Sequence, residues 1–180
     1  MLMDKERSVL LIVDIQERLM PVIDGGEAVV VRAAWLCRLA AMLEVPMVLT
    51  EQYPKGLGAT LAAVREHTAL AERVEKLCFS AAAEQALTGT ALEGREQVVI
   101  CGAETHVCVL QSAIELQRSG KQVFVVEEAV GSRSPHNKQL ALQRMRDSGI
   151  EVVSCEMVAF EWLRRAGTAQ FREVSRELIR

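Results

Sequence analysis

QVVICGAETHVCV, residues 97–109, is the most informative stretch of the sequence. Its first five residues form a short apolar run rich in β-branched side chains, which is typical of a strand buried on both faces. After a glycine, Val109, Ala113 and Leu116 recur at the three- and four-residue spacing of an amphipathic helix. The pattern therefore predicts a buried strand followed directly by a helix over residues 105–119.

Cys108 lies in the first turn of that predicted helix. Free backbone amides and the positive end of the helix dipole favour a thiolate there, so the position suits a nucleophile. In open α/β sheets, ligands also bind just beyond the carboxyl ends of the strands. The position is equally compatible with a small buried hydrophobic residue, which is how free cysteines often serve.

Strand-like and helix-like segments alternate along the whole chain. The predicted strands cover residues 8–14, 45–50, 74–79, 97–101, 122–127 and 150–154. The predicted helices cover residues 27–43, 59–66, 69–73, 81–87, 105–119, 135–148, 156–165 and 169–179. This alternation predicts an α/β fold, a three-layer α/β/α sandwich around a mainly parallel, Rossmann-like six-stranded sheet. No linker or internal repeat divides the chain, so residues 1–180 are predicted to form one domain.

The first long helix, over residues 27–43, has an apolar face. The residues expected to face the sheet are Val31, Ala34, Trp35, Leu39 and Met42. Their spacing follows the helical period, so this face should pack against the sheet.

Composition and charge exclude several classes of partner. The net charge of -3 and the 4% of aromatic residues argue against nucleic acid, because phosphate binding needs basic residues and base stacking needs aromatic ones. The N-terminus has charges where a signal peptide needs its apolar core, and the apolar run at residues 9–13 is too short to span a bilayer. We therefore expect a cytoplasmic protein with no membrane partner.

Several familiar site motifs are missing from the sequence. The strand-to-helix junctions contain neither of the glycine-rich nucleotide-binding patterns, and no G-x-S-x-G nucleophile elbow is present. The 5 cysteines include no C-x-x-C pair, which argues against a disulfide framework or a zinc site. His106 lies two residues from Cys108, and residues two apart on a helix point away from each other.

Three residues that suit thiol chemistry lie at the carboxyl ends of different predicted strands, namely Asp14, Lys76 and Cys108. A thiol nucleophile needs a base to accept its proton and a nearby cation to stabilise the thiolate. The spacing permits the three side chains to meet in one site. It also permits Asp14 to cap a turn through backbone bonds and Lys76 to lie in solvent.

Three motifs in this order resemble those of the isochorismatase-like cysteine hydrolases, a superfamily that includes nicotinamidases and N-carbamoylsarcosine amidase. The first is D-x-Q at the end of a strand, here residues 14–16, and the second is a lysine shortly followed by Phe-Ser, here residues 76–80. The third is G-[AV]-x-T-x-x-C-V, here residues 102–109. The resemblance covers about residues 8–155 and makes Lys76 a predicted catalytic residue.

The resemblance implies a catalytic triad and an amidase-type reaction. Cys108 would be the nucleophile, Asp14 would accept its proton and later activate water, and Lys76 would hold the charge pair together. The sulfur would add to a carbonyl, ammonia or an amine would leave, and water would hydrolyse the thioester. The family's isochorismate-cleaving enzymes lack this cysteine. Its presence here implies hydrolysis of a C–N bond in a small amide, ureide or related compound.

The resemblance also implies a non-proline cis peptide between Ala103 and Glu104. Such a bond costs about 3–4 kcal/mol and persists only where the surroundings enforce it. It would turn the backbone amides of Glu104 and Cys108 toward the developing oxyanion. The loss of one such donor typically costs about 3 kcal/mol of transition-state stabilisation.

The segment TEQYPKGLG, residues 50–58, departs from the nicotinamidases, which carry a histidine-containing metal cluster after the second strand. We therefore expect neither a metal nor another cofactor, and the segment is similar to the isochorismatase-domain-containing branch of the family. The pocket residues of that branch would be Gln16, Gln52, Tyr53 and Phe79. From composition alone, residues 51–53 are equally consistent with a surface turn.

Members of the family usually assemble as dimers or larger oligomers, so the resemblance implies a homo-oligomer that binds a small-molecule substrate. The C-terminal segment, residues 156–179, could form a subunit interface or pack on its own sheet. Its sequence favours neither arrangement.

Two functions of other classes remain open. The chain could be a catalytically idle binding or scaffold protein that retains the fold, and Cys108 would then be inert. It could also be a thiol redox sensor, because a cysteine of low pKa is readily oxidised. A sensor would need a resolving cysteine, for which Cys101 and Cys78 are the candidates.

Overall fold

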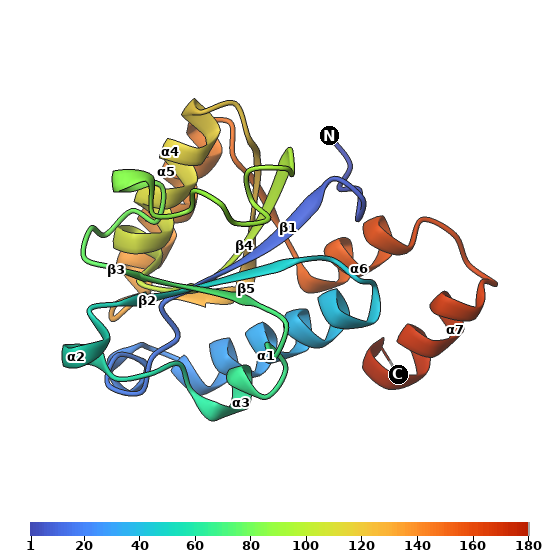
Figure 1. Cartoon of the computed structure of the whole chain (residues 1–180), viewed down its shortest axis with the longest axis horizontal. Helices are drawn as coiled ribbons and strands as arrows, with labels where there is room; N and C mark the ends of the chain where they lie inside the picture. The colour runs from blue at the N-terminus through green and yellow to red at the C-terminus, as the bar shows by residue number, and fades with distance from the viewer. Residues whose placement is uncertain (180) are drawn as a thin grey trace.

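Helices cover both faces of a central sheet in the computed structural model, which describes residues 1–179 (Figure 1). The strands are β1 (Ser8–Val13), β2 (Met47–Gln52), β3 (Glu72–Lys76), β4 (Gln97–Ala103), β5 (Gln122–Gly131) and β6 (Glu151–Val153). The α-helices are α1 (Gly26–Met42), α2 (Pro54–Leu57), α3 (Ala62–Arg65), α4 (Leu110–Arg118), α5 (Pro135–Asp147), α6 (Cys155–Leu163) and α7 (Ala169–Val174). Short 3-10 turns are η1 (Met20–Val22) and η2 (Ala83–Gln85), and short π-helical turns are η3 (Thr105–Val109) and η4 (Ser175–Ile179).

The strands of the sheet lie in the order β3-β2-β1-β4-β5-β6, and every neighbouring pair is parallel. The predicted α/β fold with a parallel six-stranded sheet is confirmed. The strand order reverses between β1 and β4, which are neighbours in the centre of the sheet. Because ligands of open α/β sheets bind at such a reversal, beyond the carboxyl ends of the strands, the segments after β1 and β4 are the first place to seek a site.

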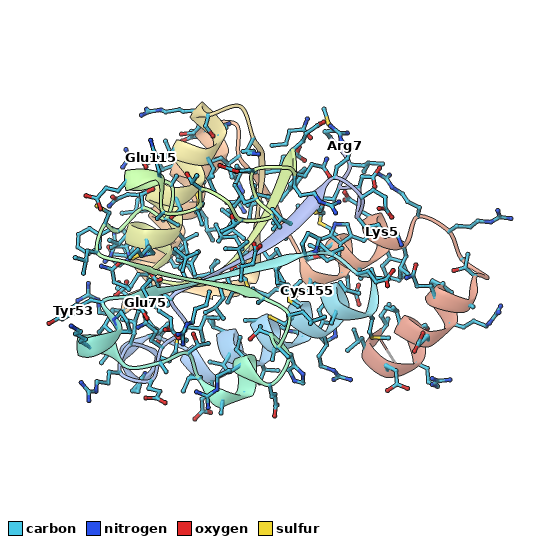
Figure 2. The ribbon with its side chains drawn as sticks, in the orientation of Figure 1. Lys5, Arg7, Tyr53, Glu75, Glu115 and Cys155 are labelled. Carbon is cyan, nitrogen blue, oxygen red and sulfur yellow. The ribbon has the colours of Figure 1, made fainter. Side chains whose placement is uncertain are left out.

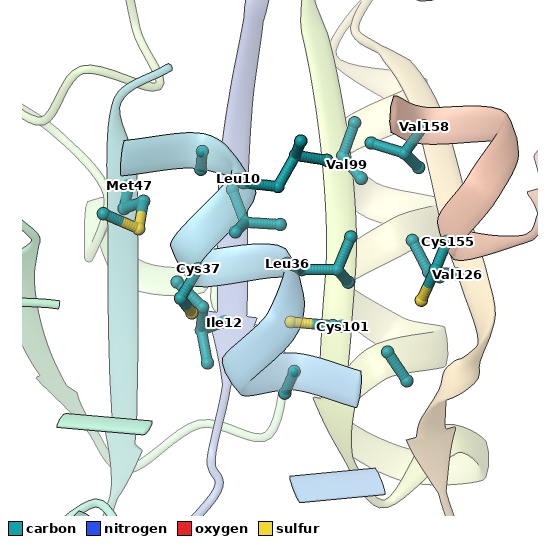
Figure 3. Packing of buried hydrophobic residues seen from close by; sticks show 14 of the residues in the cluster. Leu10, Ile12, Leu36, Cys37, Met47, Val99, Cys101, Val126, Cys155 and Val158 are labelled. Atoms are coloured by element: carbon teal, nitrogen blue, oxygen red, sulfur yellow. The ribbon is translucent and has the colours of Figure 1, made fainter. Parts of the chain in front are cut away.

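Two hydrophobic cores lie on opposite faces of the sheet, because alternate side chains of a strand point to opposite sides. In β1, Leu10 and Ile12 join the core formed with α1 and α6, whereas Leu11 and Val13 join the core formed with α4 and α5. Figure 3 shows the first core, where Leu36 of α1 lies over the sheet. All residues of β1 are buried, as the continuous apolar run of this strand predicts.

The apolar face of α1 differs in phase from the prediction. Of the residues expected to face the sheet, Leu39 is buried but Val31 is 65% exposed. The others, Ala34, Trp35 and Met42, are partly buried at the edge of the core. The residues that pack on the sheet include the small Ala33, Cys37 and Ala40 together with Val29 and Leu36. Small side chains allow a close approach of helix and sheet, whereas Trp35 is covered by the C-terminal segment through a 2.9 Å hydrogen bond to the Leu178 carbonyl.

The local predictions fail at the edge of the sheet. Residues 69–73 do not form the expected helix, since the chain turns there and enters β3, which pairs with β2. In β3 only Lys76 is fully buried, so this edge strand lacks the apolar run that marks a buried strand. The helix expected over residues 81–87 is reduced to η2, where Glu84 and Gln85 have positive φ angles.

The C-terminal segment packs on its own domain. Val174 is buried, and Phe171 and Leu178 contact the core beside α1. A role of this segment in a subunit interface and the homo-oligomer both stay predictions. None of the helices within residues 1–179 is both long and apolar enough to cross a membrane.

Candidate active site

Adjacent strands bring the three candidate residues together at one edge of the sheet. Asp14 directly follows β1, Lys76 is the last residue of β3, and Cys108 lies in η3, which follows β4. The strand order β3-β2-β1-β4 places these carboxyl ends side by side. Asp14 links the two partners, since its Oδ2 lies 2.7 Å from Lys76 Nζ and its negative charge raises the pKa of the Cys108 thiol.

Lys76 is fixed by hydrogen bonds although lysine is usually solvated. Its Nζ donates to Asp14 Oδ2 at 2.7 Å, to Gln52 Oε1 at 2.7 Å and to the Phe79 carbonyl oxygen at 3.0 Å. The Cys78 carbonyl oxygen is a fourth acceptor at 3.4 Å, so all three ammonium protons have partners. Only 1% of the Lys76 side chain is exposed, which excludes the solvated arrangement.

The Asp14 carboxylate is held from its other side by Thr50 of β2. Thr50 Oγ1 donates to Asp14 Oδ1 at 2.7 Å, and both groups are buried. The backbone of Asp14 has a φ of 53°, a left-handed conformation that aspartate tolerates better than most residues. Sequence reasoning missed Thr50, although a polar residue within the otherwise apolar run MVLT is the signal that could have identified it.

Cys108 rests as a thiol rather than as a thiolate. The pKa of the Cys108 thiol is raised from its usual 9.0 to about 12, mainly by burial and then by the negative charge of Asp14, while Lys76 lowers it. The expectation that the helix start favours a thiolate is therefore wrong, because desolvation outweighs the helix dipole here. The sulfur therefore needs a base at the moment of attack, and Asp14 is a carboxylate whose charge acts on this thiol.

Glu104 and Cys108, the residues expected to provide oxyanion donors, lie at the turn between β4 and η3 and within η3, respectively, and the peptide bond between Ala103 and Glu104 is trans. The cis bond implied by the family resemblance is therefore wrong. The chain turns here through a positive φ of 56° at Glu104. Among the described residues, the Glu104 carbonyl accepts hydrogen bonds from the Val107 and Val109 amides at 2.9 and 3.3 Å but not from the Cys108 amide between them.

A pocket of about 400 Å³ opens over Cys108. Two of the predicted substrate-binding residues, Gln52 and Phe79, line it. Its apolar wall consists of Leu19, Val22, Leu57 and Val107. Its charged lining residues are Arg18, Glu104 and Arg133. The volume suits a small molecule, and the lining combines apolar with charged and polar side chains.

The two other predicted substrate-binding residues lie elsewhere. Gln16 is fully buried, and its amide binds the backbone of Gln52 and the Gly58 carbonyl, so it holds the loop after β2 in place. Tyr53 lies at the outer edge of the molecule beside α2 (Figure 2). It lines a neighbouring pocket of about 510 Å³ that does not include Cys108.

A cluster of charged residues beside Cys108 was also missed by the sequence analysis. The Glu104 carboxylate is buried, and its Oε1 lies 2.6 Å from Arg133 Nε. Its Oε2 lies 3.2 Å from His106 Nδ1, which in turn contacts Ser132 Oγ at 3.0 Å. Arg133 belongs to the loop after β5, and a charge at the carboxyl end of a strand is the only signal its sequence offers.

The resolving cysteine that a redox sensor would need is not Cys101. The Cys101 side chain belongs to the core on the α1 face of the sheet, whereas Cys108 belongs to the opposite core. Cys78 lies in the neighbouring pocket, where its thiol contacts Glu84. Among residues 1–179, no group of three or more His, Cys, Asp or Glu side chains is placed to hold a metal ion.

Comparison with known proteins places this site in context. A family model described as the Isochorismatase domain matches residues 8–157. Isochorismatase domain-containing protein 2A of Mus musculus is 41% identical over 175 residues, which cover 95% of this chain and 82% of that protein. The secreted isochorismatase effector Isc1 of Phytophthora sojae is 36% identical over 181 residues, covering 94% of this chain and 83% of its own.

Two solved structures share the fold over nearly the whole chain. The MAR1 ribonuclease of Caenorhabditis elegans matches with a TM-score of 0.94 and 29% identity over 100% of this chain and 93% of its own. The YcaC protein of Escherichia coli, described as an octameric hydrolase of unknown specificity, matches with a TM-score of 0.90 and 23% identity. That match covers 99% of this chain and 91% of YcaC, and at this identity it concerns the fold.

Proposed function

Because this chain belongs to the isochorismatase family, we propose that it is a cysteine hydrolase acting on the C–N bond of a small amide, ureide or related carbonyl compound. One observation carries the proposal. Asp14 contacts the Lys76 ammonium at 2.7 Å and raises the pKa of the Cys108 thiol, which lines a small pocket. A buried base paired with a buried cation, close to a thiol, supplies the parts that thiol acylation requires.

In the first half-reaction, Cys108 Sγ forms a bond to the substrate carbonyl carbon while its proton passes to Asp14. Since the pKa of the thiol is about 12, this transfer accompanies attack rather than preceding it. The protonated Asp14 then gives the proton to the leaving nitrogen, and the C–N bond breaks. Ammonia or an amine departs, and a thioester on Cys108 remains.

In the second half-reaction, Asp14 accepts a proton from water, and the water oxygen attacks the thioester carbonyl. The C–S bond breaks, the acid product leaves, and Asp14 returns the proton to Cys108 Sγ. Lys76 keeps its hydrogen bonds throughout and balances the charge that Asp14 carries between proton transfers. Each cycle consumes one water and leaves the chain unchanged.

The developing oxyanion would bind the backbone amides of Glu104 and Cys108. This assignment is supported by the left-handed conformation of Glu104 and by the π-helical turn. Within the described residues, the Glu104 carbonyl accepts hydrogen bonds from the Val107 and Val109 amides and none from the Cys108 amide. Gln52 and Phe79 line the same pocket and would contact the substrate. Gln16 would act only through the loop that it holds.

Three further expectations accompany the proposal. Residues 1–180 are proposed to work as one domain without a cofactor, and the family match at residues 8–157 covers most of it. A homo-oligomer and a cytoplasmic location stay predictions. The Phytophthora sojae relative is named as secreted, so the compartment differs within the family.

A ribonuclease activity is the competing proposal raised by the name of the Caenorhabditis elegans protein. The net charge of -3 speaks against it here, because a chain without basic excess attracts RNA weakly. Incubation with a mixed RNA provides the check. Cleavage that is lost in Cys108→Ala would support the competing activity.

The experiment that tests the proposal measures ammonia or amine release from a panel of primary amides, ureides and carbamoyl compounds. Wild type is compared with Cys108→Ala and with Cys37→Ala, which removes a thiol from the opposite core. The proposal expects release by wild type and Cys37→Ala but not by Cys108→Ala, with an acyl adduct on the Cys108 peptide. Release that persists in Cys108→Ala would contradict it. Substrate binding without release in wild type would instead favour the idle binding protein.

A further inference from the structure

The pocket over Cys108 has more cationic than anionic groups. Arg18 and Arg133 both line it, and Glu104 is the only acidic side chain among its lining residues. The two arginines come from different parts of the chain, one from the loop after β1 and the other from the loop after β5. Their convergence on one small pocket therefore depends on the fold and not on a basic stretch of sequence.

Arg133 is held in position by Glu104. Its Nε lies 2.6 Å from the buried Glu104 Oε1, while 60% of the Arg133 side chain remains exposed. Among residues 1–179 no acceptor is described for its two terminal amino groups. A guanidinium group presents five N–H donors in a rigid plane. The two terminal amino groups of Arg133 therefore form a pair of donors that suits the two oxygens of a carboxylate. The Glu104 charge is paired with Arg133, which limits its repulsion of an anion.

Arg18 is positioned in a similar way on the facing loop. Its Nη1 donates to the Gly56 carbonyl at 2.9 Å, which fixes the side chain across the loop after β2. This bond uses one of its five donors. Next to it, Leu19, Val22 and Leu57 supply an apolar wall.

We propose that the substrate carries a carboxylate in addition to its scissile C–N bond, and that this carboxylate binds between Arg18 and Arg133. This inference rests on the proposed function, with the carbonyl carbon at Cys108 Sγ. A short carbon chain would contact the apolar wall between the two groups. The substrate class is therefore a small amide or ureide of a carboxylic acid, and the two arginines determine specificity.

Two alkylating reagents that are similar in size but differ in charge test this proposal without any need for turnover. Iodoacetate is an anion and iodoacetamide is neutral, and both modify Cys108 through its thiolate. Because both reagents meet the same thiolate fraction at one pH, the ratio of their rates reports anion binding rather than thiol reactivity. Initial rates are measured on the Cys108 peptide by mass spectrometry, and the ratio is divided by that for Cys78, which lies in the neighbouring pocket with Glu75 and Glu84.

The variants are Arg18→Gln, Arg133→Gln and the matched control Arg146→Gln, in which an exposed arginine near the C-terminal end of α5 is replaced. Since pairs with exposed charges contribute modestly, each pocket variant should lower the normalised iodoacetate preference about two- to fivefold. Arg146→Gln should leave it unchanged. Arg18→Lys and Arg133→Lys should retain most of it, which separates the loss of charge from a folding defect. Added salt should lower the preference of wild type as well.

A normalised ratio that neither glutamine variant changes would overturn the inference, as would an equal fall in Arg146→Gln. A second readout is protection of Cys108 from iodoacetamide, where succinate should protect better than the neutral succinamide. These readouts need no hydrolysis, so they can succeed even if the proposed amidase activity fails. Conversely, efficient Cys108-dependent hydrolysis of neutral amides, with no preference for their carboxylate analogues, would overturn only this inference.

Discussion

Lys76 Nζ lies 2.7 Å from Asp14 Oδ2, and the two side chains are 1% and 0% exposed. Removing two charges from water is costly, and a buried ion pair often contributes no more stability than apolar residues of similar volume would. The pair is nevertheless embedded in further hydrogen bonds from Thr50 and to Gln52. Such an arrangement holds one carboxylate in a fixed position near the Cys108 thiol, as the proposed hydrolase mechanism requires.

Replacement of Lys76 by methionine should leave Asp14 as an unpaired buried charge. We expect Lys76→Met to lower the free energy of unfolding by about 3–5 kcal/mol, measured by urea denaturation. The matched control is Lys138→Met, which breaks a 2.9 Å ion pair with the exposed Glu127 and should cost less than about 1 kcal/mol. Similar losses in the two variants would contradict the prediction, because they would show that removal of Lys76 does not leave a costly unpaired charge on Asp14.

Thr50 should matter through its hydroxyl group alone. Thr50→Val keeps the shape of the side chain but removes the donor to Asp14 Oδ1, and a buried acceptor without its partner costs about 1–3 kcal/mol. Thr50→Ser retains the hydroxyl and should lose less than half as much. Urea denaturation of both variants measures the difference. Equal stability of the valine and serine variants would contradict a role for this hydrogen bond.

The order of elements could be predicted because the central strands are long apolar runs. β1 and β4 are buried throughout, and their sequences leave little choice of structure. The edge strand β3 is largely exposed and has no apolar run, so the sequence predicted a helix at residues 69–73. Pairing with β2, which the sequence pattern does not reveal, makes part of this segment a strand. The phase of α1 depended on which small residues approach the sheet, and that is a property of packing rather than of periodicity.

The residues of the candidate site also fall into those that the sequence predicts and those that it does not. Strand ends made Asp14, Lys76 and Cys108 candidates, because parallel strands end at one edge, and the three motifs that resemble the family's made Lys76 a predicted catalytic residue. Arg18 and Arg133 were not, because loop conformation brings them to the pocket. Two expectations about electrostatics and backbone were wrong for related reasons. The pKa of the Cys108 thiol depends on burial in the folded chain, and the trans bond before Glu104 depends on how β4 turns into η3.

The raised pKa of the Cys108 thiol predicts its alkylation rate as a function of pH. Since only the thiolate reacts and the pKa is about 12, the rate with iodoacetamide should rise about tenfold per pH unit and show no plateau up to about pH 10. Asp14 raises this pKa, so Asp14→Asn should react faster than wild type at the same pH. A plateau near the usual value of 9.0 in wild type would contradict this prediction.

Gly102 should not tolerate a side chain. It has a φ of 142° where β4 passes the end of β1, and an added Cβ would overlap the carbonyl group of Val13. We expect Gly102→Ala to lower the unfolding free energy by more than about 3 kcal/mol, because both strain and backbone displacement oppose it. Gly120→Ala is the control, with a φ of 95° and no atom within 4 Å of the added Cβ. It should cost only about 1 kcal/mol in thermal or urea denaturation, and a cost equal to that of Gly102→Ala would show that φ strain alone decides both.

Buried thiols should make the fold sensitive to alkali. Burial raises the pKa of the Cys37 thiol from 9.0 to about 12, so above pH 9.0 the unfolded chain loses a proton that the folded chain retains. Unfolding then releases that proton, and stability falls by about 1.4 kcal/mol per pH unit for this residue, up to the folded pKa. Below pH 9.0 the folded and unfolded thiols are both protonated, and the contribution is constant. Cys37→Ala should therefore show a shallower loss of stability than wild type between about pH 9 and about pH 11 in urea denaturation, whatever its stability at neutral pH. Parallel stability curves for the two proteins over that range would show that Cys37 does not carry the raised pKa.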